Sequence, residues 1–212
     1  MQLELVSINV GKPSLIRFNG KDIMSAIAKA PVAGRVPIAF EPVQGDEQAD
    51  KVHHGGPDKA ICAYFTEHYP YWEQTMGKPL SPGAFGENFT LRGGTEHDVR
   101  IGDVFRIGEA LLQVTQPRIP CYKLAARHER LSLETEVLET GYTGFYFAVI
   151  APGSAAAGDL LTLETPHPAG VTVGEANRLM HKDKTDMEGL KKLLAVDALS
   201  ESWRQQLSKR LD

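Results

Sequence analysis

The segment Gln116–Leu124 combines, at close spacing, residue types that can do chemistry. Its sequence, QPRIPCYKL, places Cys121 directly after Pro120 and just before an expected helix, with Arg118 and Lys123 close in sequence. A thiol near a helix N-terminus and near cationic side chains ionises below its ordinary pKa of roughly 8.5. Because a thiolate attacks electrophiles and binds soft metals, the segment suggests a nucleophile or a metal ligand. A buried structural cysteine at a strand–helix junction explains the bare pattern equally well.

A second segment, Lys51–Lys59, reads KVHHGGPDK and places His53, His54 and two lysines around Gly55 and Gly56. Glycines let a backbone approach a ligand closely, and the cationic side chains could hold an anion such as phosphate. The segment is not a P-loop, because the Gly-x4-Gly-Lys-Ser/Thr spacing is absent. An ordinary Gly-Pro turn with solvated His and Lys side chains is the alternative.

A third segment, Ser81–Phe89, is a glycine-bounded loop that leads into an expected strand. Glu87 offers an acceptor, and Asn88 offers an amide that could hydrogen-bond the edge of a heterocycle. Taken alone, the segment is better explained as a β-bulge or a turn. Cys62 lies in an apolar run and is expected to be a small buried hydrophobe rather than a ligand.

A framework of short strands must position these segments. Most of the chain alternates apolar runs with Gly and Pro turns, and Asn19-Gly20 between two such runs predicts a hairpin, since both turn residues need positive φ. Strands at this density favour a closed or nearly closed barrel. Short helices are expected at Tyr122–His128 and Leu133–Thr140, and a further helix, capped by Thr66, over Glu67–Thr75.

The composition changes at Pro166-His167-Pro168, so we expect a barrel domain over residues 1–165 and a small three-helix subdomain over 166–212. Capping-box patterns at Thr172-x-x-Glu175 and Thr185-x-x-Glu188 start two of the helices, and Ser200 starts the third. A unit this small buries little surface alone, so it should pack on the barrel or on a second subunit. A homodimer is therefore expected.

Composition excludes several classes of protein. The 212 residues are 42% hydrophobic and 24% charged, which is typical of a folded domain rather than a disordered chain. The net charge of −4 and the pI near 6.0 give no basic footprint for nucleic acid. Two cysteines cannot by themselves form a tetrahedral zinc cage, an iron–sulfur site or a disulfide-rich scaffold. Neither a signal peptide nor a bilayer-spanning apolar run is visible, so we expect a cytoplasmic protein without membrane contact.

Taken together and in this order, the segments resemble the MOSC domain family, the module related to the C-terminal region of molybdenum-cofactor sulfurases. The resemblance is closest to the stand-alone YiiM-like members and covers nearly the whole chain. It is carried by His53–Ala60, Pro82–Asn88, Ile101–Asp103, Arg106–Gly108, Gln116–Leu124 and Val171–Arg178. Such a series in one order is far more specific than any single segment.

The resemblance implies a mainly β fold, a MOSC-type β-barrel with short inserted helices, followed by a small C-terminal three-helix subdomain. It also implies a molybdenum cofactor (molybdopterin), with Cys121 matching the cysteine that is expected to coordinate molybdenum. Cys121 and Arg118 are the catalytic candidates. The candidate cofactor contacts are His53, His54, Gly55, Gly56, Lys59, Phe85, Glu87, Asn88, Gln116 and Lys123.

YiiM-like members are associated with the reduction of N-hydroxylated compounds, including hydroxylaminopurine-type base analogues, which makes a small N-hydroxylated molecule the expected substrate. No flavin, haem or iron–sulfur motif is visible, so the electrons are expected from a separate donor protein. Two alternatives stay open. Cys121 could carry a persulfide in a sulfur-transfer protein, although the pyridoxal-phosphate desulfurase domain of full-length sulfurases is absent. The chain could also be a non-enzymatic cofactor carrier.

Overall fold

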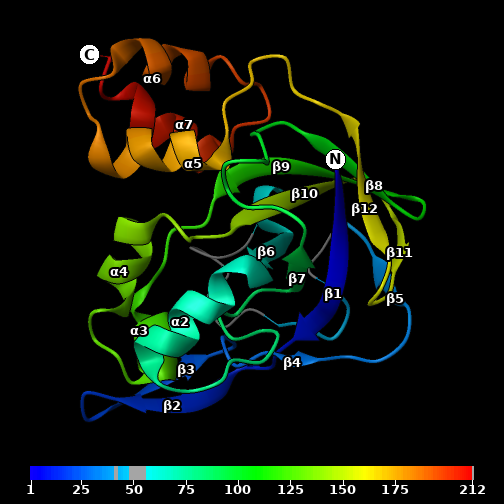
Figure 1. Cartoon of the computed structure of the whole chain (residues 1–212), viewed down its shortest axis with the longest axis vertical. Coiled ribbons are helices and arrows are strands. Elements are labelled where there is room, and N and C mark those ends of the chain that lie inside the picture. The colour runs from blue at the N-terminus through cyan, green and yellow to red at the C-terminus, as the bar shows by residue number, and fades with distance from the viewer. Residues whose placement is uncertain (41–42, 48–55, 212) are drawn as a thin grey trace.

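Seven strands close into a barrel in the order β12, β8, β9, β10, β6, β7 and β1, and β1 pairs back with β12 (Figure 1). In this computed structural model, residues 1–40, 43–47 and 56–211 are described. The barrel strands are β1 (Gln2–Val10), β6 (Ile61–Phe65), β7 (Phe89–Arg92), β8 (Val104–Ile107), β9 (Ala110–Pro117), β10 (Phe145–Ala151) and β12 (Leu160–Thr165). β6 and β7 run parallel, and the other neighbouring pairs are antiparallel. The predicted mainly β barrel is confirmed.

The barrel interior is filled by alternate side chains of its strands. In β10, Phe145 and Phe147 are fully buried while Tyr146 between them is not. In β9, Leu112 and Val114 point inward with the same period of two. This alternation is the expected consequence of strand geometry, in which successive side chains point to opposite faces of the sheet.

The remaining strands are short and lie outside the barrel wall. β2 (Ser14–Phe18) and β3 (Lys21–Ser25) form the predicted hairpin, with Asn19 at φ 50° and Gly20 at φ 75°. β4 (Ala30–Pro31) pairs with β1, and β5 (Val36–Ile38) pairs with β11 (Gly153–Ala155). The β5 strand, which contains Pro37, thus lies in a two-stranded sheet outside the barrel, where the missing N–H of proline is tolerated.

The helices α2 (Tyr69–Met76), α3 (Tyr122–His128) and α4 (Leu133–Thr140) lie at the lower left of the barrel in Figure 1. Two 3-10 turns, η1 (Pro57–Lys59) and η2 (Thr66–His68), come just before β6 and α2. α3 and α4 have the predicted bounds. The predicted cap of α2 is wrong: Thr66 starts η2, its hydroxyl contacts Glu67, and α2 begins at Tyr69. The reason is Pro70, which the first turn of a helix accommodates because an N–H there has no intrahelical partner.

The C-terminal unit consists of α5 (Val173–Asn177), the π-helical turn η3 (Arg178–Lys182), α6 (Met187–Leu194) and α7 (Glu201–Ser208). The capping box at Thr172 and Glu175 is confirmed, and Ser200 caps α7 as predicted. The second predicted capping box is wrong, because Asp186 caps α6 through a 2.8 Å bond from Gly189 N. Thr185 instead donates to Asp183.

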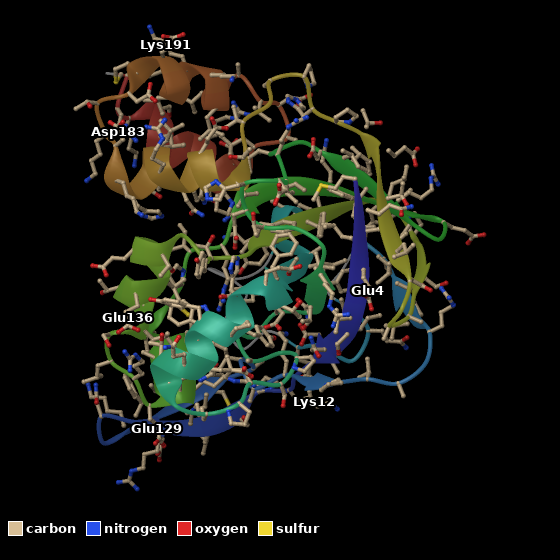
Figure 2. All side chains as sticks on the ribbon, viewed as in Figure 1. Glu4, Lys12, Glu129, Glu136, Asp183 and Lys191 are labelled. Carbon is tan, nitrogen blue, oxygen red and sulfur yellow. The ribbon has the colours of Figure 1, made fainter. Side chains whose placement is uncertain are left out.

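The C-terminal unit packs directly on the barrel. Val173, Ala176, Trp203 and Leu207 are buried in one hydrophobic cluster with barrel residues such as Val114. Figure 1 shows the unit seated over β9 and β10, and Figure 2 shows its charged side chains Lys191 and Asp183 on the outer side. No helix within the described ranges is long and apolar enough to cross a membrane. The proposed boundary at residues 165 and 166 remains a prediction.

Candidate functional site

A cavity lies where β9 ends and the chain turns into α3. It contains about 660 Å³ of space that no protein atom occupies, part of it open to solvent. Five predicted site residues line it: Lys59, Asn88, Arg118, Cys121 and Lys123. The rest of the lining comes from Ser25, Ala26, Ile27, Lys29, Asp46, Glu47, Cys62, Gly86, Ile119 and Tyr146. Segments far apart in sequence therefore converge on one hollow.

Cys121 occupies the junction that the sequence predicted. It is the N-cap residue of α3 with extended backbone, φ −134° and ψ 161°, and its carbonyl accepts a 2.8 Å bond from Leu124 N. The thiol is partly exposed and lines the cavity. An accessible thiol at the N-terminus of a helix is positioned to contact a ligand rather than to pack in the core.

Arg118 is a buried cation with an unused donor. The residue is 6% exposed, and its Nη1 finds no hydrogen-bond partner among the residues that the structure describes. Burial lowers the pKa of Arg118, but the neighbouring Cys62, Tyr146, Cys121 and Glu87 together outweigh burial and raise it. The guanidinium therefore stays charged. Burial of a charged group costs free energy when one of its N–H groups has no acceptor, unless an anion or another acceptor binds there.

The opposite side of the cavity carries a buried ion pair. Lys29 Nζ contacts Asp46 Oδ1, and the two side chains are only 8% and 4% exposed. Asp46 also accepts from Gly11 N at 2.8 Å and from Asn88 Nδ2 at 2.9 Å. Asn88 Oδ1 in turn accepts from Cys62 N at 3.1 Å. Both the oxygen and the nitrogen of the Asn88 amide are thus hydrogen-bonded to protein groups. Asn88 therefore serves mainly to form the cavity wall, and less to bind a ligand.

Four predicted cofactor contacts among the described residues do not line the cavity: Gly56, Phe85, Glu87 and Gln116. Phe85 is fully buried and stacks on Tyr64, with ring centroids 4.2 Å apart. Glu87 is also fully buried, and its carboxylate accepts from Tyr69 Oη, Gly83 N, Phe85 N and Thr90 Oγ1 at 2.8–2.9 Å. Gln116 is 2% exposed and bonds to the Pro117 carbonyl and to Ser202. Protein groups already take up the polar atoms of Glu87 and Gln116, and their role as cofactor contacts, like that of Phe85, stays a prediction.

The histidine–glycine segment is only partly described. His53, His54 and Gly55 lie outside the described residues. Gly56 has φ 105° and precedes the Pro57–Lys59 turn, so a glycine is required there. Lys59 lines the cavity; burial lowers the pKa of its ammonium group, and the Asp58 carboxylate opposes that effect.

Cys62 and Tyr146 are site residues that sequence reasoning missed. They are cross-strand partners in β6 and β10, and both line the cavity. Burial raises the pKa of the Cys62 thiol to about 11, and burial also raises the pKa of the Tyr146 phenol. The alternation of Phe145, Tyr146 and Phe147 already points Tyr146 away from the core, and that signal could have found it.

Comparison with known protein families divides the chain into two matched parts. Residues 50–162 match the MOSC domain, and residues 171–212 match the YiiM-like, 3-alpha helix domain. The chain is 46% identical to the uncharacterized protein YflK of Bacillus subtilis over 208 residues, which are 98% of this chain and 94% of YflK.

Two further proteins resemble the chain. The crystal structure of YiiM from Geobacillus stearothermophilus superposes with a TM-score of 0.85 at 39% identity, covering 99% of this chain and 100% of that one. A protein of Gibberella moniliformis named "Reductase" is 35% identical over 156 residues. Those residues are 70% of this chain but 27% of the fungal protein.

Proposed function

The chain belongs to the MOSC domain family and carries the YiiM-like three-helix domain at its C-terminal end, and from this premise we propose that it is an oxidoreductase that binds a molybdenum cofactor and reduces N-hydroxylated compounds. One observation carries the proposal: a partly exposed thiol, Cys121, shares a cavity with a buried arginine, Arg118, whose Nη1 has no partner among the described residues. The fungal relative named a reductase is consistent with such an activity.

The residues of the cavity fit this cofactor. Its dithiolene provides two sulfur ligands to molybdenum, and the Cys121 thiolate is a third ligand of the same soft character. Its phosphate requires cations and fixed N–H donors, which Arg118, Lys59 and Lys123 can supply from the cavity wall. When bound, the cofactor would supply two-electron chemistry at an N–O bond.

The protein's own groups would hold the substrate by hydrogen bonds. Reduction of R–NH–OH to R–NH₂ and water breaks the N–O bond and consumes two electrons and two protons. Cys62 Sγ and Tyr146 Oη both keep their protons at neutral pH because burial raises their pKa values. They can therefore donate hydrogen bonds to an oxygen in the cavity. Arg118 would provide a fixed positive charge beside them.

The two electrons need a source outside the chain. We expect a separate donor protein to supply them, and a chemical reductant can replace that donor in a test. Asp46 and Glu47 line the same cavity as the cations, so its charge is mixed rather than wholly positive. This mixture favours a small polar substrate over a second highly charged anion.

The test is turnover of a hydroxylaminopurine by protein made in a host that synthesises the cofactor, with a chemical reductant as electron source. We expect loss of the substrate, formation of the aminopurine, and molybdenum and pterin in the purified protein. Molybdenum without turnover would instead identify a cofactor carrier. Protein that lacks molybdenum but carries a persulfide on Cys121 would identify a sulfur carrier.

A further inference from the structure

Two segments that build the cavity wall are joined to the same end of helix α7. One is the Pro57–Lys59 turn, which places Lys59 in the cavity wall. The other is the end of β9, where Thr115 and Gln116 precede Arg118 by only a few residues. The C-terminal unit thus contacts the site through its last helix.

Asp58 lies at the centre of these contacts. The backbone N–H of Glu201, the first residue of α7, donates to Asp58 Oδ2 at 3.2 Å. The Thr115 hydroxyl donates to the Asp58 carbonyl at 2.6 Å, and Ser200 N donates to the Thr115 carbonyl at 3.2 Å. An anion is favourable at this position, because the first N–H groups of a helix lack intrahelical partners and carry partial positive charge.

A parallel contact holds the residue before Pro117. Ser202 Oγ donates to Gln116 Oε1 at 3.3 Å, and Gln116 Nε2 donates to the Pro117 carbonyl at 3.1 Å. Gln116 is 2% exposed, whereas Ser202 is exposed, so the contact joins a buried side chain of β9 to the surface of α7. The position of Gln116 thus accounts for its absence from the cavity lining: it connects β9 to α7.

We propose that Asp58 is a positioning residue that fastens the Pro57–Lys59 turn to the N-terminus of α7, so that the C-terminal helical unit holds the Lys59 side of the cofactor cavity in place. The identity of the ligand rests on the proposed function, whereas the contact between Asp58 and the N-terminus of α7 does not. The Asp58 carboxylate also opposes the effect of burial on the pKa of Lys59, which helps to keep that ammonium charged. The three-helix unit then has a role in the site besides its hydrophobic packing.

The sharpest test removes one N–H. Glu201→Pro deletes the donor to Asp58 yet suits the helix, since proline is favoured at the first helical position and Ser200, at φ −53° and ψ 146°, already has the conformation of a residue before proline. Glu201→Ala is the matched control, because it loses the same side chain and keeps the N–H. Hydrogen exchange of peptides spanning residues 56–61 is measured on both proteins without cofactor.

We expect exchange in this turn to be faster in Glu201→Pro than in Glu201→Ala by about 3- to 10-fold, the effect of one ordinary hydrogen bond at an exposed position. Exchange in β1, a barrel strand that pairs with neither β9 nor β6, should be equal in the two variants. Equal exchange at residues 56–61 would overturn the proposal. This readout needs no cofactor, so it stands even if the wild-type protein binds no molybdenum and the proposed function fails.

Substitution of Asp58 itself separates positioning from folding. Asp58→Asn keeps an oxygen that accepts from Glu201 N, whereas Asp58→Ala does not. With cofactor-loaded protein, we expect retention of molybdenum after dialysis to fall in the order wild type, Asn, Ala, with turnover per bound molybdenum unchanged. If both variants retain the cofactor like wild type, or if turnover per molybdenum falls while retention does not, Asp58 does not act through the Lys59 turn.

Discussion

Two loops near the cavity each bury a charged side chain: Gly83–Asn88 and Pro117–Cys121. The two charged groups differ in how fully protein groups bond to them. Glu87 in the first loop has its carboxylate saturated by four hydrogen bonds from protein groups. Arg118 in the second leaves Nη1 without a partner among the described residues. Burying a charge is tolerable only when partners meet it. A satisfied charge therefore indicates structure, and an unsatisfied charge indicates a ligand.

The surroundings of the two loops follow the same division. Phe85 packs into a second hydrophobic cluster with Tyr64, Trp72 and Leu124, and this cluster lies apart from the barrel interior. The second loop instead leads to Cys121, which is partly exposed at the cavity. Changes at Phe85 and Glu87 of the first loop should therefore cost stability, and changes at Arg118 and Cys121 of the second should cost ligand binding.

The largest effect on stability is expected from Glu87→Ala. It leaves several buried donors without an acceptor, and loss of such a buried charged partner costs about 3–5 kcal/mol. The free energy of unfolding from urea titration measures this loss. Glu109→Ala, at an exposed turn, is the control and should stay within about 0.5 kcal/mol of wild type. A Glu87 variant as stable as the control would break the comparison.

Arg118→Met should show the opposite behaviour. Methionine has similar length and removes a buried charge that is not fully paired, so the free energy of unfolding should stay within about 1 kcal/mol of wild type or rise. The molybdenum content of protein from a cofactor-competent host should fall by about 10-fold or more, the effect of losing a charge-assisted contact of roughly 1.5–3 kcal/mol. Destabilisation as large as that of Glu87→Ala would make Arg118 a structural charge.

The Cys62 thiol gives the cavity a distinct response to alkaline pH. Burial raises its pKa from 9.0 to about 11. Because the folded-state pKa is the higher one, its stabilising contribution is complete below about pH 9 and disappears as the pH rises through about 11. Two pKa units correspond to about 2–3 kcal/mol. Urea titrations across this range should show a smaller loss of stability for Cys62→Ala than for wild type, and parallel curves would contradict the assignment.

The smallest expected effect is that of Tyr64→Phe in the second hydrophobic cluster. Trp72 Nε1 donates to Tyr64 Oη at 2.7 Å, and both residues are fully buried. Removing the hydroxyl leaves the indole N–H unpaired, which costs about 1–3 kcal/mol. Thermal denaturation should show the loss, while molybdenum content should match wild type. A decrease in molybdenum content would show that the two loops are not separable.

Local features of the fold were predictable from sequence because local chemistry decides them. Asn19-Gly20 predicts its hairpin through positive φ, and Thr172 with Glu175 predicts the start of α5 through a reciprocal pair of hydrogen bonds. The order of the strands was not predictable, because the parallel pairing of β6 with β7 brings together segments separated by a helix and a long loop. Thr185 failed as a cap because Asp186, one residue later, offers a carboxylate for the same role.

The site was predictable only where function needs a reactive group. Cys121, Arg118 and Lys123 could be selected because a thiol and two cations near an expected helix start are residue types that can do chemistry, and all three line the cavity. The four protein groups that bond to the Glu87 carboxylate were not predictable, because sequence cannot show how many donors converge on it. Lys29 and Asp46 gave no signal, since their ion pair forms between loops that have no motif.

The most direct test of the central claim is the molybdenum and pterin content of three proteins from a cofactor-competent host: wild type, Cys121→Ser and Cys62→Ser. Both variants exchange a thiol in the same cavity for a harder and far less acidic hydroxyl, so they differ only in which position changes. We predict that wild type and Cys62→Ser contain molybdenum and pterin in equal amounts, and that Cys121→Ser loses the metal. Molybdenum retained at the wild-type level in Cys121→Ser would contradict the account.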